Sequence, residues 1–185
     1  TADVKTGNWR ARVNVGNSAF EKTIRIEAIK PNRLKIKFDF DQKVLSLNNT
    51  KGKLSSKWLH GANAGNLRAV VEMNLSDGNT EFKGYKNYSF DDPSKSFSVE
   101  EEKVFDGKLN DLGEITVSPT IEVGKRAPGM ITASFKTRVF EKGGDFSVDR
   151  FKITYSPYES YVGVKIPDGT GWNGALYSNE TNLIP

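Results

Sequence analysis

The chain has 185 residues, of which 36% are hydrophobic and 27% charged, and its formal net charge is +4. It contains no cysteine, which excludes a disulfide framework, a thiolate metal site and a cysteine nucleophile. No stretch approaches the roughly 20 consecutive apolar residues of a membrane-spanning helix, so direct membrane insertion is not expected.

Apolar residues alternate with polar ones along almost the whole chain, and no 12-residue window has the 3.6-residue period of an amphipathic helix. This pattern predicts an all-β, antiparallel fibronectin- or immunoglobulin-like sandwich of ten to twelve short strands. The alternating segments are, in chain order, 9–15, 24–28, 34–40, 67–75, 115–123, 131–139, 151–155 and 162–166.

Turn-forming residues divide these segments and set the predicted organisation. Residues 7–29 are predicted to form a tight hairpin across Gly16-Asn17, after which Pro31 interrupts pairing because it has no amide hydrogen. Further turns are expected at Asp77-Gly78, Asp106-Gly107 and Gly143-Gly144. The main sandwich is expected from about residue 44 to 156, with Leu67, Val71, Ile131, Phe135 and Ile153 inside.

The basic residues lie within the strand pattern, as in Leu34-Lys35-Ile36-Lys37-Phe38. Such alternation is typical of the solvated face of a half-buried strand, so a nucleic-acid partner is not expected.

The sequence contains no strong catalytic or metal-binding motif. His60 is the single histidine, and no serine lies in a Gly-x-Ser-x-Gly turn, so His60 is interpreted as a packing or hydrogen-bonding residue. The run Glu100-Glu101-Glu102 is better explained as the solvated edge of a sheet than as a glycosidase pair. Asp91, Asp92 and Asp145 could contribute to a calcium site, although no calcium-loop motif is present. No catalytic residue, metal or cofactor is therefore predicted.

Several segments resemble the macroglobulin domains of bacterial alpha-2-macroglobulin-like proteins, in particular a Bacteroidetes-like branch. Residues 20–34 resemble the junction at which one macroglobulin domain runs through a proline into the next. Trp58-Leu59-His60-Gly61-Ala62-Asn63-Ala64 is similar to an aromatic-Leu-Tyr-Gly-Ala-Pro-Ala turn of that family, with Asn63 replacing the usual proline. Residues 105–109, 137–147 and 155–163 extend the resemblance over most of the chain.

The resemblance implies a non-catalytic structural module of a large protease inhibitor, secreted or held in the cell envelope as a periplasmic or outer-membrane-anchored lipoprotein. Its expected partners are the neighbouring macroglobulin domains and, through the full-length protein, host or foreign proteases. Residues 1–42 would be the final strands of a preceding domain plus a linker strand, 43–157 a complete domain, and 158–185 the start of a following domain or a linker.

Candidate contacts between domains are Pro31, Trp58, His60, Tyr158 and Tyr161. The alternative hypothesis is a carbohydrate-binding or adhesin-like sandwich, in which Tyr85, Tyr88, Phe90 and the tyrosines near residue 158 would form an exposed stacking platform.

Overall fold

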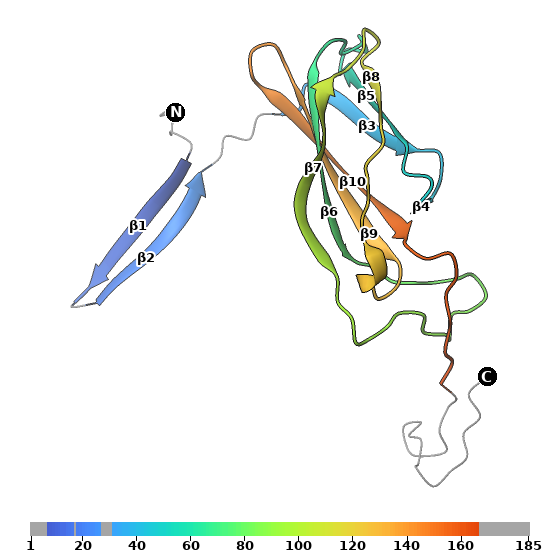
Figure 1. Cartoon of the computed structure of the whole chain (residues 1–185). Helices are drawn as coiled ribbons and strands as arrows, with labels where there is room; N and C mark the ends of the chain where they lie inside the picture. Colours follow the sequence, from blue (N-terminus) through green and yellow to red (C-terminus); the bar gives the residue numbers. More distant parts are fainter. Residues whose placement is uncertain (1–6, 17, 27–30, 167–185) are drawn as a thin grey trace. The chain divides into compact units, whose positions relative to one another are not determined.

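The structure, a computed structural model, describes residues 7–16, 18–26 and 31–166. The chain divides into two compact units, Thr1–Asn32 and Arg33–Pro185. Figure 1 shows the strands of both units.

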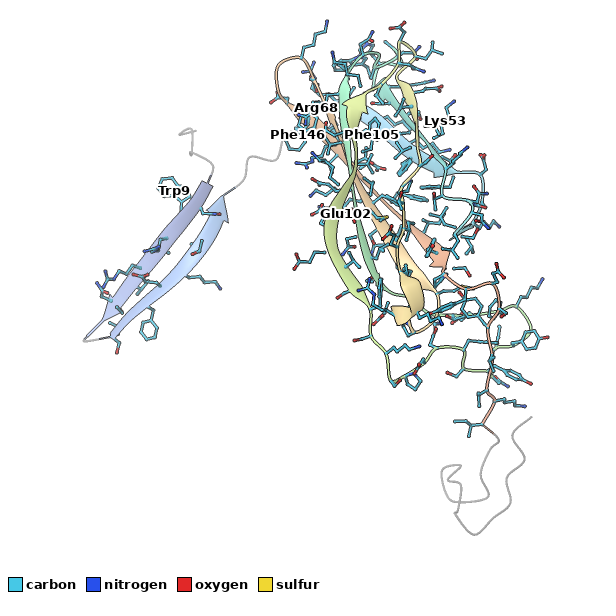
Figure 2. The ribbon with its side chains drawn as sticks, viewed as in Figure 1. Trp9, Lys53, Arg68, Glu102, Phe105 and Phe146 are labelled. Atoms are coloured by element: carbon cyan, nitrogen blue, oxygen red, sulfur yellow. The ribbon has the colours of Figure 1, made fainter. Side chains whose placement is uncertain are left out.

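The first unit is the predicted hairpin. Strands β1 (Gly7–Val15) and β2 (Ser18–Ile26) pair antiparallel from Gly7 opposite Ile26 to Val15 opposite Ser18. Gly16 supplies the positive φ of +58° that the tight turn needs. One face of the hairpin is apolar and exposed, with Trp9 (Figure 2) and Ile24 opposite each other and about half accessible.

The second unit is a sandwich of two sheets (Figure 1). The larger sheet has the order β4-β10-β9-β6-β7, and the smaller one the order β3-β5-β8. All pairs are antiparallel except β4 with β10. The strands are β3 (Leu34–Phe40), β4 (Val44–Ser46), β5 (Gly52–Trp58), β6 (Arg68–Asp77), β7 (Ser98–Lys108), β8 (Glu114–Val117), β9 (Ile131–Phe140) and β10 (Phe146–Ser156). A 3₁₀ turn, η1 (Gly124–Arg126), is the single helical element among the described residues.

The sequence-based core is confirmed. Inward-pointing residues of alternating strands fill the space between the sheets, as the two-residue period requires. The five residues predicted to be inside are all buried: Leu67, Val71, Ile131, Phe135 and Ile153.

Strand β3 differs from the expected organisation, in which it was a linker strand before the sandwich. It pairs along its whole length with β5, from Leu34 opposite Trp58 to Phe40 opposite Gly52. Phe38 and Phe40 then cross the core to Phe135 of β9, with ring centroids 5.1 and 5.5 Å apart. The compact unit therefore begins at Arg33, ten residues before the expected boundary between 42 and 43.

Three smaller expectations also change. Asp106-Gly107 is not a turn, because both residues pair with β6 inside β7. Strand β8 ends at Val117, so the expected strand over 115–123 is about half as long. The chain continues as a loop in which Ile121 and Val123 are buried and their neighbours are exposed. Residues 162–166 form only a single bridge, between Ser89 and Val164, instead of a strand.

The acidic run lies on an edge strand, as the pattern indicated. β7 is the last strand of the larger sheet, and Glu100, Glu101 and Glu102 are all exposed on it. Figure 2 labels Glu102, which stands opposite the buried Met73 of β6. Charged side chains exposed on an edge strand discourage pairing with a further strand.

Candidate interdomain contact sites

The first candidate site is where the chain passes into the sandwich, and we call it the junction clamp: Arg33, Trp58, Glu141 and Ser147. The backbone N–H groups of Arg33 and Leu34 both donate to the buried hydroxyl of Ser147, at 3.0 and 3.1 Å. The Arg33 guanidinium lies 2.8 Å from the carboxylate of Glu141, whose side chain is only 9% exposed. The first residue of the sandwich is thus fixed through both its backbone and its side chain.

Trp58 completes the clamp from the smaller sheet. The guanidinium carbon of Arg33 lies 5.5 Å from the centre of the Trp58 ring, within the range of a cation–π contact. On the same tryptophan the ring of His60 stacks at 6.1 Å with an interplanar angle of 19°. Gly61, at φ +98°, makes the turn that folds His60 back over Trp58.

A hollow of about 480 Å³ opens beside the clamp, lined by Arg33, Trp58, Gly65, Leu67, Glu141, Lys142, Gly143 and Asp145. Two predicted contact residues, Trp58 and His60, therefore lie together, and Pro31 stands exposed two residues before Arg33. Arg33, Glu141 and Ser147 were not predicted. Arg33 is more than 100 residues from both of its partners in sequence. The β9–β10 hairpin holds Glu141 and Ser147 close together, and the start of β3 lies against them.

The second candidate site is where the chain leaves the sandwich, and it holds the other two predicted contact residues. The rings of Tyr158 and Tyr161 meet edge to face at 5.7 Å. The Tyr158 hydroxyl donates to the carbonyl of Ala127 at 2.6 Å, and the Tyr161 hydroxyl lies 2.8 Å from that of Ser156. Burial raises the pKa of Tyr161, so its hydroxyl stays a hydrogen-bonding group well above neutral pH.

Further aromatic rings continue from Tyr161 into the long loop between β6 and β7. Phe82 lies 5.5 Å from Tyr161 and 4.8 Å from Phe90, while Tyr85 lies 5.5 Å from Tyr88. We call this group of rings (Phe82, Tyr85, Tyr88, Phe90 and Tyr161) the exit cluster. A hollow of about 600 Å³ opens over the exit cluster.

The five predicted contact residues thus do not form one site. Junction clamp and exit cluster lie at opposite ends of the second unit (Figure 1). Strand β10 connects them, because Ser147 is near its start and Ser156 is its last residue.

The outer face of the larger sheet carries a network of paired charges. Glu72 pairs with both Lys136 and Arg138 of the neighbouring strand, and Glu101 pairs with Lys136 at 2.7 Å. Arg68, labelled in Figure 2, donates two hydrogen bonds of 2.8 Å to Asp106. Carboxylates therefore neutralise cations on this face.

The same contacts shift the pKa values of the acids. Hydrogen bonds from Arg68 and then Lys103 hold the pKa of Asp106 far below its usual range. The hydrogen bond from Lys136 lowers the pKa of Glu101 and raises that of Lys136 itself. Both acids are consequently ionised throughout the physiological pH range.

Within the described ranges, no three acidic or histidine side chains gather closely enough to hold a metal ion. None of the described segments forms a helix with the length and apolar composition needed to cross a bilayer.

A family model described as the bacterial alpha-2-macroglobulin MG5 domain matches residues 32–157. No curated protein matches the chain.

Among solved structures, the chain is similar to native Escherichia coli alpha-2-macroglobulin, with 20% identity, a TM-score of 0.61, and coverage of 89% of this chain and 10% of that one. Salmonella alpha-2-macroglobulin reacted with methylamine gives 19% identity and a TM-score of 0.58 over 89% of this chain and 11% of that one. Escherichia coli alpha-2-macroglobulin activated by porcine elastase gives 19% identity and a TM-score of 0.55 over 89% of this chain and 15% of that one. The chain thus spans about a tenth of the length of the structures that it resembles.

Proposed function

The chain belongs to the bacterial alpha-2-macroglobulin family, and on that premise we propose that it is a non-catalytic structural module of an envelope-associated protease trap. One observation carries the proposal most directly: each end of the sandwich has side chains held in place by hydrogen bonds and ring contacts, and a single strand connects the two sets. A module in a train of domains needs defined contacts where the chain enters and where it leaves.

The junction clamp supports this role because it fixes the point at which the preceding segment joins the sandwich. An exposed ion pair alone would contribute little. Here Glu141 is nearly buried, and two backbone N–H groups share the buried Ser147 hydroxyl. The position of Arg33 is therefore set by directional bonds and not only by one flexible side chain.

The hairpin of the first unit fits the same proposal as the final strands of a preceding macroglobulin domain. An isolated two-stranded hairpin is at best marginally stable in water. Its exposed face carries Trp9, Val13, Phe20 and Ile24, which a third strand or a second sheet would cover. In this assignment residues 1–32 complete a preceding domain, 33–157 form one whole domain, and 158–185 begin the connection to the next.

The proposed setting and partners follow from the family. We place the parent protein in the cell envelope or outside the cell, with neighbouring macroglobulin domains and proteases as its partners. Two of the similar Escherichia coli structures are described as activated by trypsin and by porcine elastase, and serine proteases of this kind are the first to test. The assignment to a Bacteroidetes-like branch stays a prediction.

The test uses the parent polypeptide and the 185-residue chain side by side. Each is incubated with trypsin or elastase, and the remaining activity is measured on a large protein substrate and on a small chromogenic peptide. We expect the parent to suppress cleavage of the protein substrate while sparing the peptide, and the 185-residue chain to do neither. Hydrolysis or stoichiometric inhibition by the 185-residue chain alone would contradict the proposal.

A variant of the junction clamp then connects the module to that activity. Glu141→Gln in the parent removes the charge that holds Arg33. The control Glu122→Gln removes the charge of an exposed side chain that lies in neither the junction clamp nor the exit cluster and for which the described residues show no ion pair. We expect weaker trapping only with the first variant. Equal trapping by wild type and both variants would show that the clamp has no part in the function.

A further inference from the structure

The exit cluster stands apart from the sandwich core. Tyr85 is 54% exposed, and neither Phe82 nor Phe90 belongs to the core cluster of buried residues. The loop that carries these rings, residues 78–97, is longer than the 12–15 residues beyond which irregular connections become uncommon and usually functional. Packing of the core does not explain these rings.

The loop is nevertheless firmly built. The buried hydroxyl of Thr80 donates to the carboxylate of Asp91 and accepts the backbone N–H of Met130 at 2.7 Å. Ser89 and Val164 exchange two backbone hydrogen bonds of 2.8 Å, which ties the loop to the departing chain. The rings of the exit cluster are thus presented on a fixed framework.

The departing chain adds apolar surface beside the cluster. Val162, Val164 and Ile166 are 85%, 44% and 65% exposed, and Gly163 lies against the ring of Phe90, where a Cβ would overlap with it. Large aromatic rings beside exposed aliphatic residues, with Lys83 and Glu159 at the rim of the hollow, match the apolar centre and polar rim of a protein interface.

Resting on the proposed function, we propose that the exit cluster and residues 162–166 form the docking surface for the domain that follows in the same polypeptide. The occupant is indicated by where the chain leaves. The bridge between Ser89 and Val164 holds the chain at the rim of the hollow only two residues before Ile166, the last described residue. A domain that follows in the polypeptide is tethered at this point, at an effective concentration of about 1 mM, so that even a weak contact would be occupied most of the time.

The geometry of the rings favours this occupant over a sugar. A sugar stacks on an open ring face, whereas Tyr85 meets Tyr88 and Phe90 edge to face, at interplanar angles of 80° and 85°. Tyr88 and Phe90 lie nearly parallel, at 27°, but Tyr85 stands across both of them, so the three rings together do not form one flat platform. Carbohydrate binding is kept as an outcome of the test.

The experiment compares amide hydrogen exchange of residues 82–90 in the parent polypeptide and in the 185-residue chain. We expect exchange about tenfold slower in the parent, because a contact with an intrinsic Kd near 0.1 mM is about 90% closed at an effective concentration of about 1 mM. Tyr85→Ala in the parent should return the rate toward that of the 185-residue chain. The control Leu112→Ser, which alters an exposed apolar residue in another loop, should leave the rate unchanged.

Equal exchange rates in the two proteins would overturn the proposal. So would saturable binding of the 185-residue chain to a glycan array that Tyr85→Ala abolishes, since the hollow would then be a sugar site. If exchange is slower in the parent but the parent traps no protease, the docking surface is confirmed. Only the proposed role in a protease trap is then refuted.

Discussion

Ser147→Ala should destabilise the sandwich far more than an ordinary serine substitution. The Ser147 hydroxyl is buried and accepts two backbone N–H groups, those of Arg33 and Leu34. Leu34 is also buried, so its N–H would lose its partner without gaining water, which costs about 1–3 kcal/mol. The hydrogen bond from the N–H of Arg33 is only partly buried, so its loss would add about 1 kcal/mol at most. We expect a loss of about 2–3 kcal/mol, or about 5–10 °C in Tm for a unit of this size.

The assay is urea unfolding followed by circular dichroism, with tryptophan fluorescence as a second probe because Trp58 contacts Arg33. Ser134→Ala is the matched control: it also lies in the larger sheet, it is only half-buried, and the described residues show no hydrogen bond to its hydroxyl. A loss below about 0.5 kcal/mol for Ser147→Ala, or an equal loss for the control, would refute the reasoning about the clamp.

Three further predictions concern the same unit. The pKa of Asp106 is lower in the folded than in the unfolded chain, so its stabilising effect is present above about pH 4 and is lost as the pH falls below that value. Asp106→Asn should therefore reduce the decrease in urea midpoint between pH 5 and pH 3, and an unchanged slope would contradict this. Gly65→Ala should cost about 1–3 kcal/mol because its Cβ would overlap with the Asp111 carbonyl, whereas Gly143→Ala meets nothing and should be neutral in the same measurement. Removing residues 1–31 should change the calorimetric Tm of the sandwich by less than about 3 °C, and a larger decrease would show that the hairpin stabilises it.

The sequence was most informative about residues whose position depends on local periodicity. Leu67, Val71 and Phe135 are buried as predicted because side chains of a strand alternate between two faces whatever its partner is. Periodicity does not predict which strand pairs with which. The strand Leu34–Phe40 has the same alternation whether it ends one domain or begins the next, and only the packing of its phenylalanines on Phe135 decides between them.

Local turn signals failed where long-range pairing was stronger. Asp106-Gly107 is a favourable turn dipeptide, yet it continues β7 because Ala69 and Val70 of β6 pair with it and Arg68 binds Asp106. The candidate sites show the same limit. Trp58 and His60 could be found because they lie within one resembling segment, whereas Ser147 gives no local sign that it binds the backbone of residues 113 and 114 positions earlier.

Strand β10 gives the module a direct mechanical connection between its two ends. Ser147 and Ser156 lie nine residues apart on this strand, which corresponds to about 30 Å at 3.3 Å per residue. The strand pairs with β9 over ten consecutive residue pairs, from Phe146 to Tyr155, so a sharp kink within this span would break hydrogen bonds of the ladder. Near its start, Ser147 binds the backbone N–H of Arg33. At its end, the hydroxyl of Ser156 lies within hydrogen-bond distance of the Tyr161 hydroxyl. We expect a change in the direction of the chain at one end to turn the sandwich as one body, and so to reach the other end as a change of orientation and not of internal structure.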